Sequence, residues 1–194
     1  MTPLDKLIAY FEKFPGIGGR QAKRFAFHIL TLKSEQVAEL ASLITAIQES
    51  VSECSECHRF FSLQRQPTDG KCPICADISR DNSKLIVVAR DTDIQAIERS
   101  GVYDGLYFVL GGTVPLLGSS ESNSRVRTPA FRALITDRLE KGLKEVIFAF
   151  SVNPDGENTG RFIENALKEI SGTSTLKISQ LGRGLSTGSE LEYA

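Results

Sequence analysis

Apolar residues in the first part of the chain recur at helical spacing. Between residues 4 and 11 they lie three and four apart, directly after Thr2 and Pro3, which suit an N-cap and a first helical position. The run Pro15–Gly19 interrupts the pattern, and a second apolar stripe begins near Arg20. The pattern predicts two helices joined by a glycine-rich turn.

A third helix is expected after Ser34. Its apolar positions again recur at helical spacing and predict one face that packs inward. The residues expected on this inner face are Val37, Leu40, Ala41, Ile44, Ile47 and Val51.

From Lys84 onward, short apolar runs alternate with helical stretches. The expected strands are Leu85–Val88, Leu106–Val109, Val146–Phe150 and Leu176–Ser179. The expected helices run from Thr92 to Ser100, from Pro129 to Lys141 and from Asn158 to Ile170. Strands that are apolar throughout and alternate with helices indicate an α/β fold with a mainly parallel sheet, covered on both faces. Such a sheet offers a site at its carboxyl edge.

The cysteines stand as two close pairs, Cys54-x2-Cys57 and Cys72-x2-Cys75, with fourteen residues between the pairs. Each pair makes a tight turn that aims two thiolates at one point, and the two pairs together match the tetrahedral site that zinc prefers. Four thiolates leave no open position for water or substrate, so we expect one structural zinc ion per chain. A module this small has too little core to fold without the metal.

Two other interpretations of the cysteines stay open at this point, namely four reduced buried thiols or a redox pair. His58 follows Cys57 directly and is the only possible further ligand. We expect its ring to point away from the metal.

The net charge of the chain is −1, so any surface for nucleic acid has to be local. Residues 1–33 contain six basic and two acidic residues, which gives this segment a charge of +4. The amino terminus lacks the pattern of an export signal, and no apolar run approaches the roughly 18 residues of a membrane span. We therefore expect a cytoplasmic protein that has no membrane partner.

The glycine-rich turn lies within this positive segment. Glycines let the backbone approach a phosphate closely, and free N–H groups at the start of the following helix favour an anion. Basic residues three and four apart share one helical face beside that turn. We expect sequence-nonspecific DNA binding that weakens steeply with salt; a plain helical hairpin with solvated basic residues is the alternative. The expected DNA-binding residues are Gly16, Gly18, Gly19, Arg20, Lys23 and Arg24.

The order of these parts resembles the bacterial RecR recombination mediators over essentially the whole chain. The segments that carry the resemblance are Pro15–Gly18 through Ala26–His28, Cys72–Cys75, Ala96–Gly101, and Arg183–Leu185 through Leu191–Ala194. The resemblance implies three parts: a helix-hairpin-helix DNA-binding region at 1–52, a four-cysteine zinc finger at 53–80, and a Toprim-like α/β domain with a C-terminal segment at 81–194.

The resemblance also implies a function. RecR proteins assemble as homo-oligomers, as dimers or ring-like tetramers that encircle or clamp DNA, and they work with RecO and often with RecF. Together these proteins help RecA to form filaments on single-stranded DNA during recombinational repair. The implied role is to hold DNA and partner proteins without catalysing a reaction.

The sequence departs from the RecR pattern at acidic positions. Where the family usually has a Glu-Asp pair after the first α/β strand, this chain has Ala89-Arg90, with Asp91 and Asp93 displaced along the loop. A later acidic loop is present in altered form as Asn153–Glu157. The family commonly continues into a short tail that helps to bind neighbouring subunits, whereas this sequence ends at Ala194.

These acidic residues have more than one interpretation. Asp91, Asp93, Asp155 and Glu157 are expected to contact a partner such as RecO, or else to cap helices and lie in solvent. A Toprim enzyme, such as a primase, nuclease or topoisomerase, would instead use carboxylates at strand ends to hold magnesium. Ala89 cannot bind a metal, which argues against an enzyme. An adaptor that binds only proteins is a third possibility.

Overall fold

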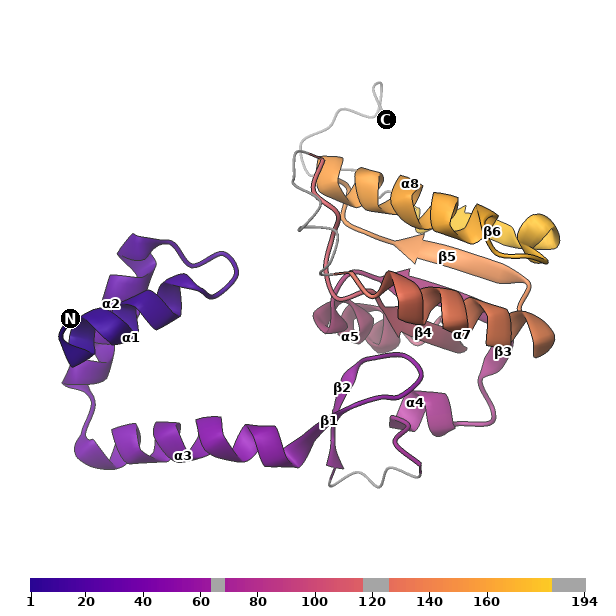
Figure 1. Ribbon diagram of the computed structural model, residues 1–194. Coiled ribbons are helices and arrows are strands. Elements are labelled where there is room, and N and C mark those ends of the chain that lie inside the picture. Colours follow the sequence, from indigo (N-terminus) through magenta and orange to yellow (C-terminus); the bar gives the residue numbers. More distant parts are fainter. Residues whose placement is uncertain (64–68, 117–125, 183–194) are drawn as a thin grey trace. The chain divides into compact units, whose positions relative to one another are not determined.

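The computed structural model describes residues 1–63, 69–116 and 126–182. Within it the chain forms two compact units, Met1–Ser50 and Val51–Ala194. The first unit is helical, and the second carries the cysteines and the sheet (Figure 1). The C-terminal segments of the RecR resemblance, Arg183–Leu185 and Leu191–Ala194, lie outside the described residues.

The first unit begins with a helical hairpin, α1 (Pro3–Glu12) followed by α2 (Gly19–Thr31). Thr2 caps α1, because its Oγ1 accepts a hydrogen bond from the Asp5 N–H at 3.2 Å while the Asp5 carboxylate accepts from the Thr2 N–H at 2.8 Å. Only two alanines of α2, Ala22 and Ala26, are fully buried between the helices. The predicted helix, turn and helix are confirmed.

The third helix, α3 (Ser34–Ser50), is present, but the expectation of an inward-packing face is wrong. No residue of α3 is buried, and Ile44 and Ile47 in the middle of the expected face are 63% and 58% exposed. The reason is that, within the first unit, neither α1 nor α2 packs along this stripe. Although α3 is the longest described helix, neither it nor any other helix of the described part is long and apolar enough to cross a membrane.

The second unit contains a four-stranded parallel sheet in the order β4-β3-β5-β6. Its strands are β3 (Asp81–Val88), β4 (Gly105–Val109), β5 (Glu145–Ala149) and β6 (Lys177–Gln180). The helices after β3, β4 and β5 are α5 (Asp91–Ser100), α7 (Thr128–Glu140) and α8 (Pro154–Lys168), and a 3-10 turn, η2 (Thr173–Thr175), precedes β6. The predicted parallel α/β fold is confirmed.

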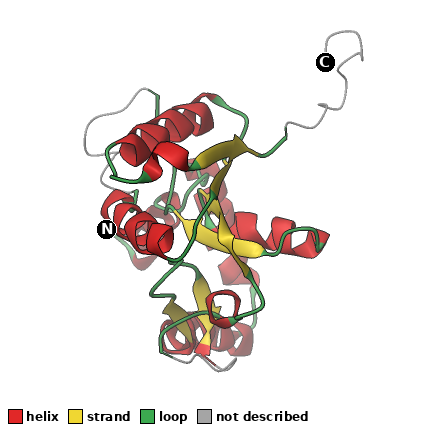
Figure 2. Ribbon diagram, turned by 90° about the vertical axis from the view of Figure 1, so that its right-hand side faces the viewer, coloured by secondary structure: helices red, strands yellow, loops and turns green. Residues whose placement is uncertain are grey.

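The two faces of the sheet have different covers (Figures 1 and 2). Leu85 and Val87 of β3 point to the face covered by α7 and α8. Ile86 and Val88 alternate to the opposite face, where α5 and the cysteine module pack. This module consists of an antiparallel pair, β1 (Val51–Glu53) and β2 (Phe60–Ser62), and a single helical turn, α4 (Pro73–Ala76). The cysteine module therefore covers one face of the sheet.

Helix α8 begins at Pro154, four residues before the expected start at Asn158. Pro154 occupies a first helical position, and the Asn153 side chain accepts a hydrogen bond from the Gly156 N–H at 2.8 Å. The acidic segment expected to form a loop is therefore the first turn of a helix. A Cβ added to Gly156 would lie 2.0 Å from the Ser151 carbonyl oxygen, so the start of α8 packs directly on the preceding backbone.

This close approach generates a prediction for the stability of the second unit. Gly156→Ala should lower the free energy of unfolding by about 3 kcal/mol, because the added methyl group overlaps a backbone oxygen that cannot move alone. In the same helix, Gly160→Ala would place its Cβ 3.9 Å from Phe148 and Phe150, an ordinary contact. It should raise stability by about 0.5–1 kcal/mol through helix propensity. Urea unfolding of both variants tests the pair, and equal effects would contradict the packing.

Candidate metal centre and nucleic-acid interface

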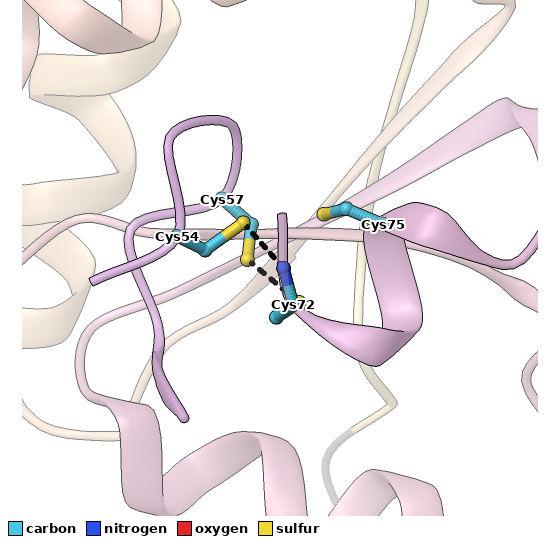
Figure 3. Close-up of side chains that lie close together, drawn as sticks. All are labelled: Cys54, Cys57, Cys72 and Cys75. Carbon is cyan, nitrogen blue, oxygen red and sulfur yellow. Dashed lines mark hydrogen bonds between the residues drawn. The ribbon is translucent and has the colours of Figure 1, made fainter. Parts of the chain in front are cut away.

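The four cysteine side chains converge on one point (Figure 3). One sulfur atom from each of Cys54, Cys57, Cys72 and Cys75 lies within 4.8 Å of the other three. The Cys57 and Cys72 sulfurs are 3.6 Å apart, and the Cys72 N–H donates to the Cys54 sulfur at 3.2 Å. In a tetrahedral zinc site with bonds of ~2.3 Å, sulfur atoms lie roughly 3.8 Å apart, so this arrangement has the size of a zinc site.

The chemistry of these donors fits a bound cation. Three of the four cysteines are buried. Interaction with Cys57 lowers the pKa of the Cys54 thiol, and the same interaction raises the pKa of the Cys57 thiol. Sulfur atoms this close together cannot all be thiolates unless a positive charge lies between them, and a soft divalent metal such as zinc supplies it. His58 is not part of this group.

The cysteine module joins the sheet through its backbone. The Val109 N–H, at the end of edge strand β4, donates to the Cys57 carbonyl at 2.8 Å. The next residue, His58, has φ +60°, a left-handed conformation that glycine favours. Its ring packs edge-on against Phe108, with 5.4 Å between the centroids, and its Nδ1 lies 2.7 Å from the Glu53 carboxylate. His58 therefore has a packing role.

A buried ion pair makes a second connection between the module and the sheet domain. Arg138 of α7 is 8% exposed, and it donates to the Glu56 carboxylate within the first cysteine pair and to the Asn82 side chain at 2.9 Å. Lys71 approaches the same carboxylate at 2.6 Å. The sequence analysis missed this pair, because an arginine on a helix and a glutamate between two cysteines both look solvent-exposed in sequence.

The hairpin between α1 and α2 leaves the start of α2 open. Gly16 has φ +78°, a conformation that favours glycine, and a Cβ on Gly16 or Gly18 would meet no atom within 4 Å. Gly18 is the N-cap of α2, and no side chain caps the helix. Gly19 packs against the Glu12 side chain. The start of α2 therefore has no side-chain cap, and the Glu12 side chain lies beside Gly19.

The basic residues of α2 lie beside this position. Arg20, Lys23 and Arg24 are all exposed, and none of them forms an ion pair with another described residue. Spaced three and four apart in one helix, they follow one side of α2. Their charges are therefore available to an external anion.

The acidic residues lie at the carboxyl edge of the sheet but do not converge. The Asp91 carboxylate accepts from the Phe60 N–H, and Asp93 accepts from the Arg90 N–H at 2.9 Å. Asp155, in the first turn of α8, accepts from the Leu116 N–H at 3.0 Å. Within residues 1–63, 69–116 and 126–182, the cysteines form the only group of metal-binding side chains.

One capping assignment from the sequence is corrected by this geometry. Asp91 does not cap α5; Asp93 does, because the N–H of the N-cap residue, Arg90, points to its carboxylate. Asp91 connects α5 to the cysteine module instead. Ala89 is buried at the end of β3 and offers no ligand atom.

Comparison with known proteins agrees with this architecture. Residues 4–47 match the family model described as RecR, helix-hairpin-helix, and residues 83–181 match the Toprim domain. The chain is 36% identical over 194 residues to the recombination protein RecR of Streptococcus thermophilus, covering 100% of this chain and 90% of that protein. It is also 36% identical to the recombination protein RecR of Ligilactobacillus salivarius, and the match covers 99% of this chain and 90% of that protein.

The fold and the sites together define a multidomain Toprim protein that carries a helix-hairpin-helix unit and a four-cysteine centre. The chain belongs to the RecR family of recombination proteins.

The metal centre generates a prediction. Cys72→Ser should abolish stoichiometric zinc and unfold the cysteine module, since metal binding supplies on the order of 10 kcal/mol of the folding free energy of such sites. Ser55→Ala, an exposed position between the first two cysteines, should keep both zinc and melting temperature. Zinc content by mass spectrometry and thermal unfolding are the measurements. A Cys72→Ser protein with one zinc and unchanged melting would refute the assignment.

The buried ion pair between Arg138 and Glu56 generates a prediction about stability. Glu56→Gln should destabilise the protein by about 3 kcal/mol, because it leaves the Arg138 charge buried without its partner. Asp137→Asn breaks the exposed pair with Lys141, whose side chains are 50% and 53% exposed, and should change stability by no more than about 0.5 kcal/mol. Chemical denaturation of the two variants compares them directly; a similar small effect from both would show that Arg138 is adequately solvated.

Proposed function

We propose that this protein is a non-catalytic, sequence-nonspecific DNA-binding mediator of recombinational repair. The observation that carries the proposal is the uncapped start of α2, beside which Arg20, Lys23 and Arg24 are exposed and form no ion pair with a described residue. Backbone N–H groups at a helix start bind a phosphate oxygen, and the three basic side chains neutralise neighbouring phosphates. These contacts recognise the sugar-phosphate backbone and not the bases, so we expect little sequence preference.

In this proposal the glycines and basic residues have separate roles. Gly16 sets the turn, and Gly18 with Gly19 brings the backbone close to a phosphate, as the open space above Gly18 permits. Arg20, Lys23 and Arg24 supply the charge. The region 1–52 would hold DNA, the cysteine module at 53–80 would stabilise the protein through one structural zinc ion, and the Toprim-like part at 81–194 would present surfaces to partners.

The proposal includes self-assembly. In the first unit only Ala22 and Ala26 are fully buried, while α2 and α3 expose large apolar side chains such as Phe27 and Leu43. A unit with so little core of its own gains stability when those side chains are covered by another surface. We propose a homo-oligomer, a dimer or a ring-like tetramer able to enclose DNA.

We propose the remaining partners on the basis of the resemblance to RecR proteins. RecO, and in some hosts RecF, would bind the oligomer and promote loading of RecA onto single-stranded DNA. The proposed partner contacts are Asp91 and Asp93 at the start of α5 and Asp155 and Glu157 at the start of α8. Both helices start at the same edge of the sheet, because β3 and β5 are adjacent and parallel. Free cysteines suit a reducing compartment, and we place the protein in the cytoplasm.

A charge-reversal experiment tests the DNA-binding surface. The double variant Arg20→Glu/Lys23→Glu should bind DNA at least about tenfold more weakly at low salt, and the slope of log affinity against log salt should fall by about 2 on duplex DNA. Fluorescence anisotropy with labelled single-stranded and duplex DNA of several sequences is the measurement.

The matched control reverses one charge elsewhere in the same unit. Lys33 lies between α2 and α3, away from the glycine-rich turn. Lys33→Glu should therefore reduce the affinity for DNA only slightly. If the double variant and the control bound DNA equally well, the hairpin would not be the interface. Unequal affinity for different sequences in the unmodified protein would contradict backbone recognition.

A further inference from the structure

The four cysteines of the proposed zinc site differ in their exposure to solvent. Cys54, Cys57 and Cys72 are 0%, 1% and 0% exposed, whereas Cys75 is only partly buried. Figure 3 shows Cys75 on the single helical turn α4, opposite the segment that carries Cys54 and Cys57. Of these four side chains, Cys75 is therefore the one that a small molecule in solvent meets first.

The hydrogen bonds of the cluster also set Cys75 apart. The Cys72 N–H donates to the Cys54 sulfur at 3.2 Å, and the Cys57 and Cys72 sulfurs lie 3.6 Å apart. None of these contacts, drawn as dashed lines in Figure 3, reaches the Cys75 sulfur. Hydrogen bonds to a sulfur ligand draw on its electron density and are one means by which a protein tunes such a site. Cys75 combines contact with solvent with a sulfur that receives none of them.

Cys72 and Cys75 also have the arrangement of a thiol redox pair. Cys72 is the N-cap of α4, and Cys75 lies three residues later in the same turn. Residues at this spacing are neighbours on a helix, and Cys-x2-Cys pairs are common in redox proteins. The two sulfurs lie within 4.8 Å of each other. A bond between them therefore needs only a small movement of the side chains. The zinc and redox interpretations of the cysteines are thus compatible in one site.

We infer that Cys75 is an oxidation site, at which a small hydroperoxide such as hydrogen peroxide forms a Cys72–Cys75 disulfide and causes the loss of the bound zinc ion. The inference rests on the proposed structural zinc. Cys75 is the residue attacked because it is the ligand in contact with solvent, and Cys72 completes the reaction because it is the neighbour in the same helical turn.

The reaction proceeds in two steps. The Cys75 thiolate attacks one peroxide oxygen, the O–O bond breaks, and the sulfur is oxidised to a sulfenic acid while hydroxide leaves. The Cys72 thiolate then attacks the Cys75 sulfur, the S–O bond breaks, and a second hydroxide leaves as the disulfide forms. The two sulfurs together lose two electrons, which reduce one peroxide to two hydroxide ions, and solvent protonates these to water.

The disulfide removes half of the metal ligands. Cys54 and Cys57 alone do not complete the tetrahedral set of four that structural zinc requires. The cysteine module packs on the face of the sheet that carries Ile86 and Val88, so metal loss also loosens the packing on that face. Oxidation at Cys75 therefore lowers the stability of the second unit, and a thiol reductant with added zinc restores it.

The experiment treats the full chain, loaded with zinc, with hydrogen peroxide and follows zinc release with a chromogenic chelator. Remaining thiols are then alkylated, and tryptic peptides are analysed by mass spectrometry. Trypsin separates the two cysteine pairs, because Arg59 and Lys71 lie between them. The peptide that begins at Cys72 should lose two hydrogen atoms in step with zinc release. This disulfide should be at least about tenfold more abundant than any other when zinc is first lost.

A conservative variant tests the attacked position. Cys75→His keeps a Cys3His ligand set of the kind that binds structural zinc, but it removes the thiolate in contact with solvent. It should retain zinc and release it at least about tenfold more slowly under peroxide. Ser55→Ala, exposed within the first cysteine pair, is the matched control and should release zinc at the rate of the unmodified protein.

The peptide analysis of the unmodified protein decides the question even if Cys75→His does not fold. The inference is overturned if the first disulfide contains Cys54 or Cys57, or if zinc is released while Cys72 and Cys75 remain reduced. Zinc release from a folded Cys75→His protein at the rate of the unmodified protein would also overturn it. Zinc content before treatment separates the two claims, because a folded protein without zinc contradicts the metal assignment itself, whereas the other results concern Cys75 alone.

Discussion

The cysteine module covers part of one face of the central sheet, and its own interior consists of four sulfur atoms. The packing of the second unit depends on this arrangement. Cys54, Cys57 and Cys72 belong to the same buried cluster as Ile86 and Val88 of β3. The metal that fits these sulfurs would therefore stabilise the sheet as well as the module. The hydrogen bond from Val109 to Cys57 and the buried Glu56–Arg138 pair add two further connections. Through these contacts the cysteine module and the Toprim-like sheet pack as one unit.

The helical unit has the opposite character. Its hairpin buries two alanines, and its large apolar side chains on α2 and α3 remain exposed. Such a unit is a poor candidate for independent stability, and its exposed stripe suits a surface that assembles with another. The same unit carries the exposed basic residues of the proposed DNA interface. Assembly would place several copies of that interface on one DNA molecule, which strengthens weak nonspecific contacts through local concentration.

The acidic side chains at the carboxyl edge of the sheet accept backbone hydrogen bonds and do not gather into a metal site within the described residues. Ala89 ends β3 without a ligand atom, and Asp91, Asp93 and Asp155 each accept a backbone hydrogen bond. Carboxylates used in this way set the starts of helices and connect neighbouring elements. Asp91 in particular joins α5 to β2.

The sequence by itself determined most of the helices and strands and the cysteine cluster. Apolar spacing predicted α1, α2 and all four strands of the sheet, and the two Cys-x2-Cys pairs predicted the sulfur cluster, because both signals are local and depend only on spacing along the chain. The helix start at Pro154 was missed, although Asn153-Pro154 is a local signal for it. Only the tertiary structure decided which surfaces are covered. The exposure of α3 and the burial of Arg138 against Glu56 both depend on residues distant in sequence. Spacing along the chain carries no information about such contacts, since they arise only when separate elements pack together.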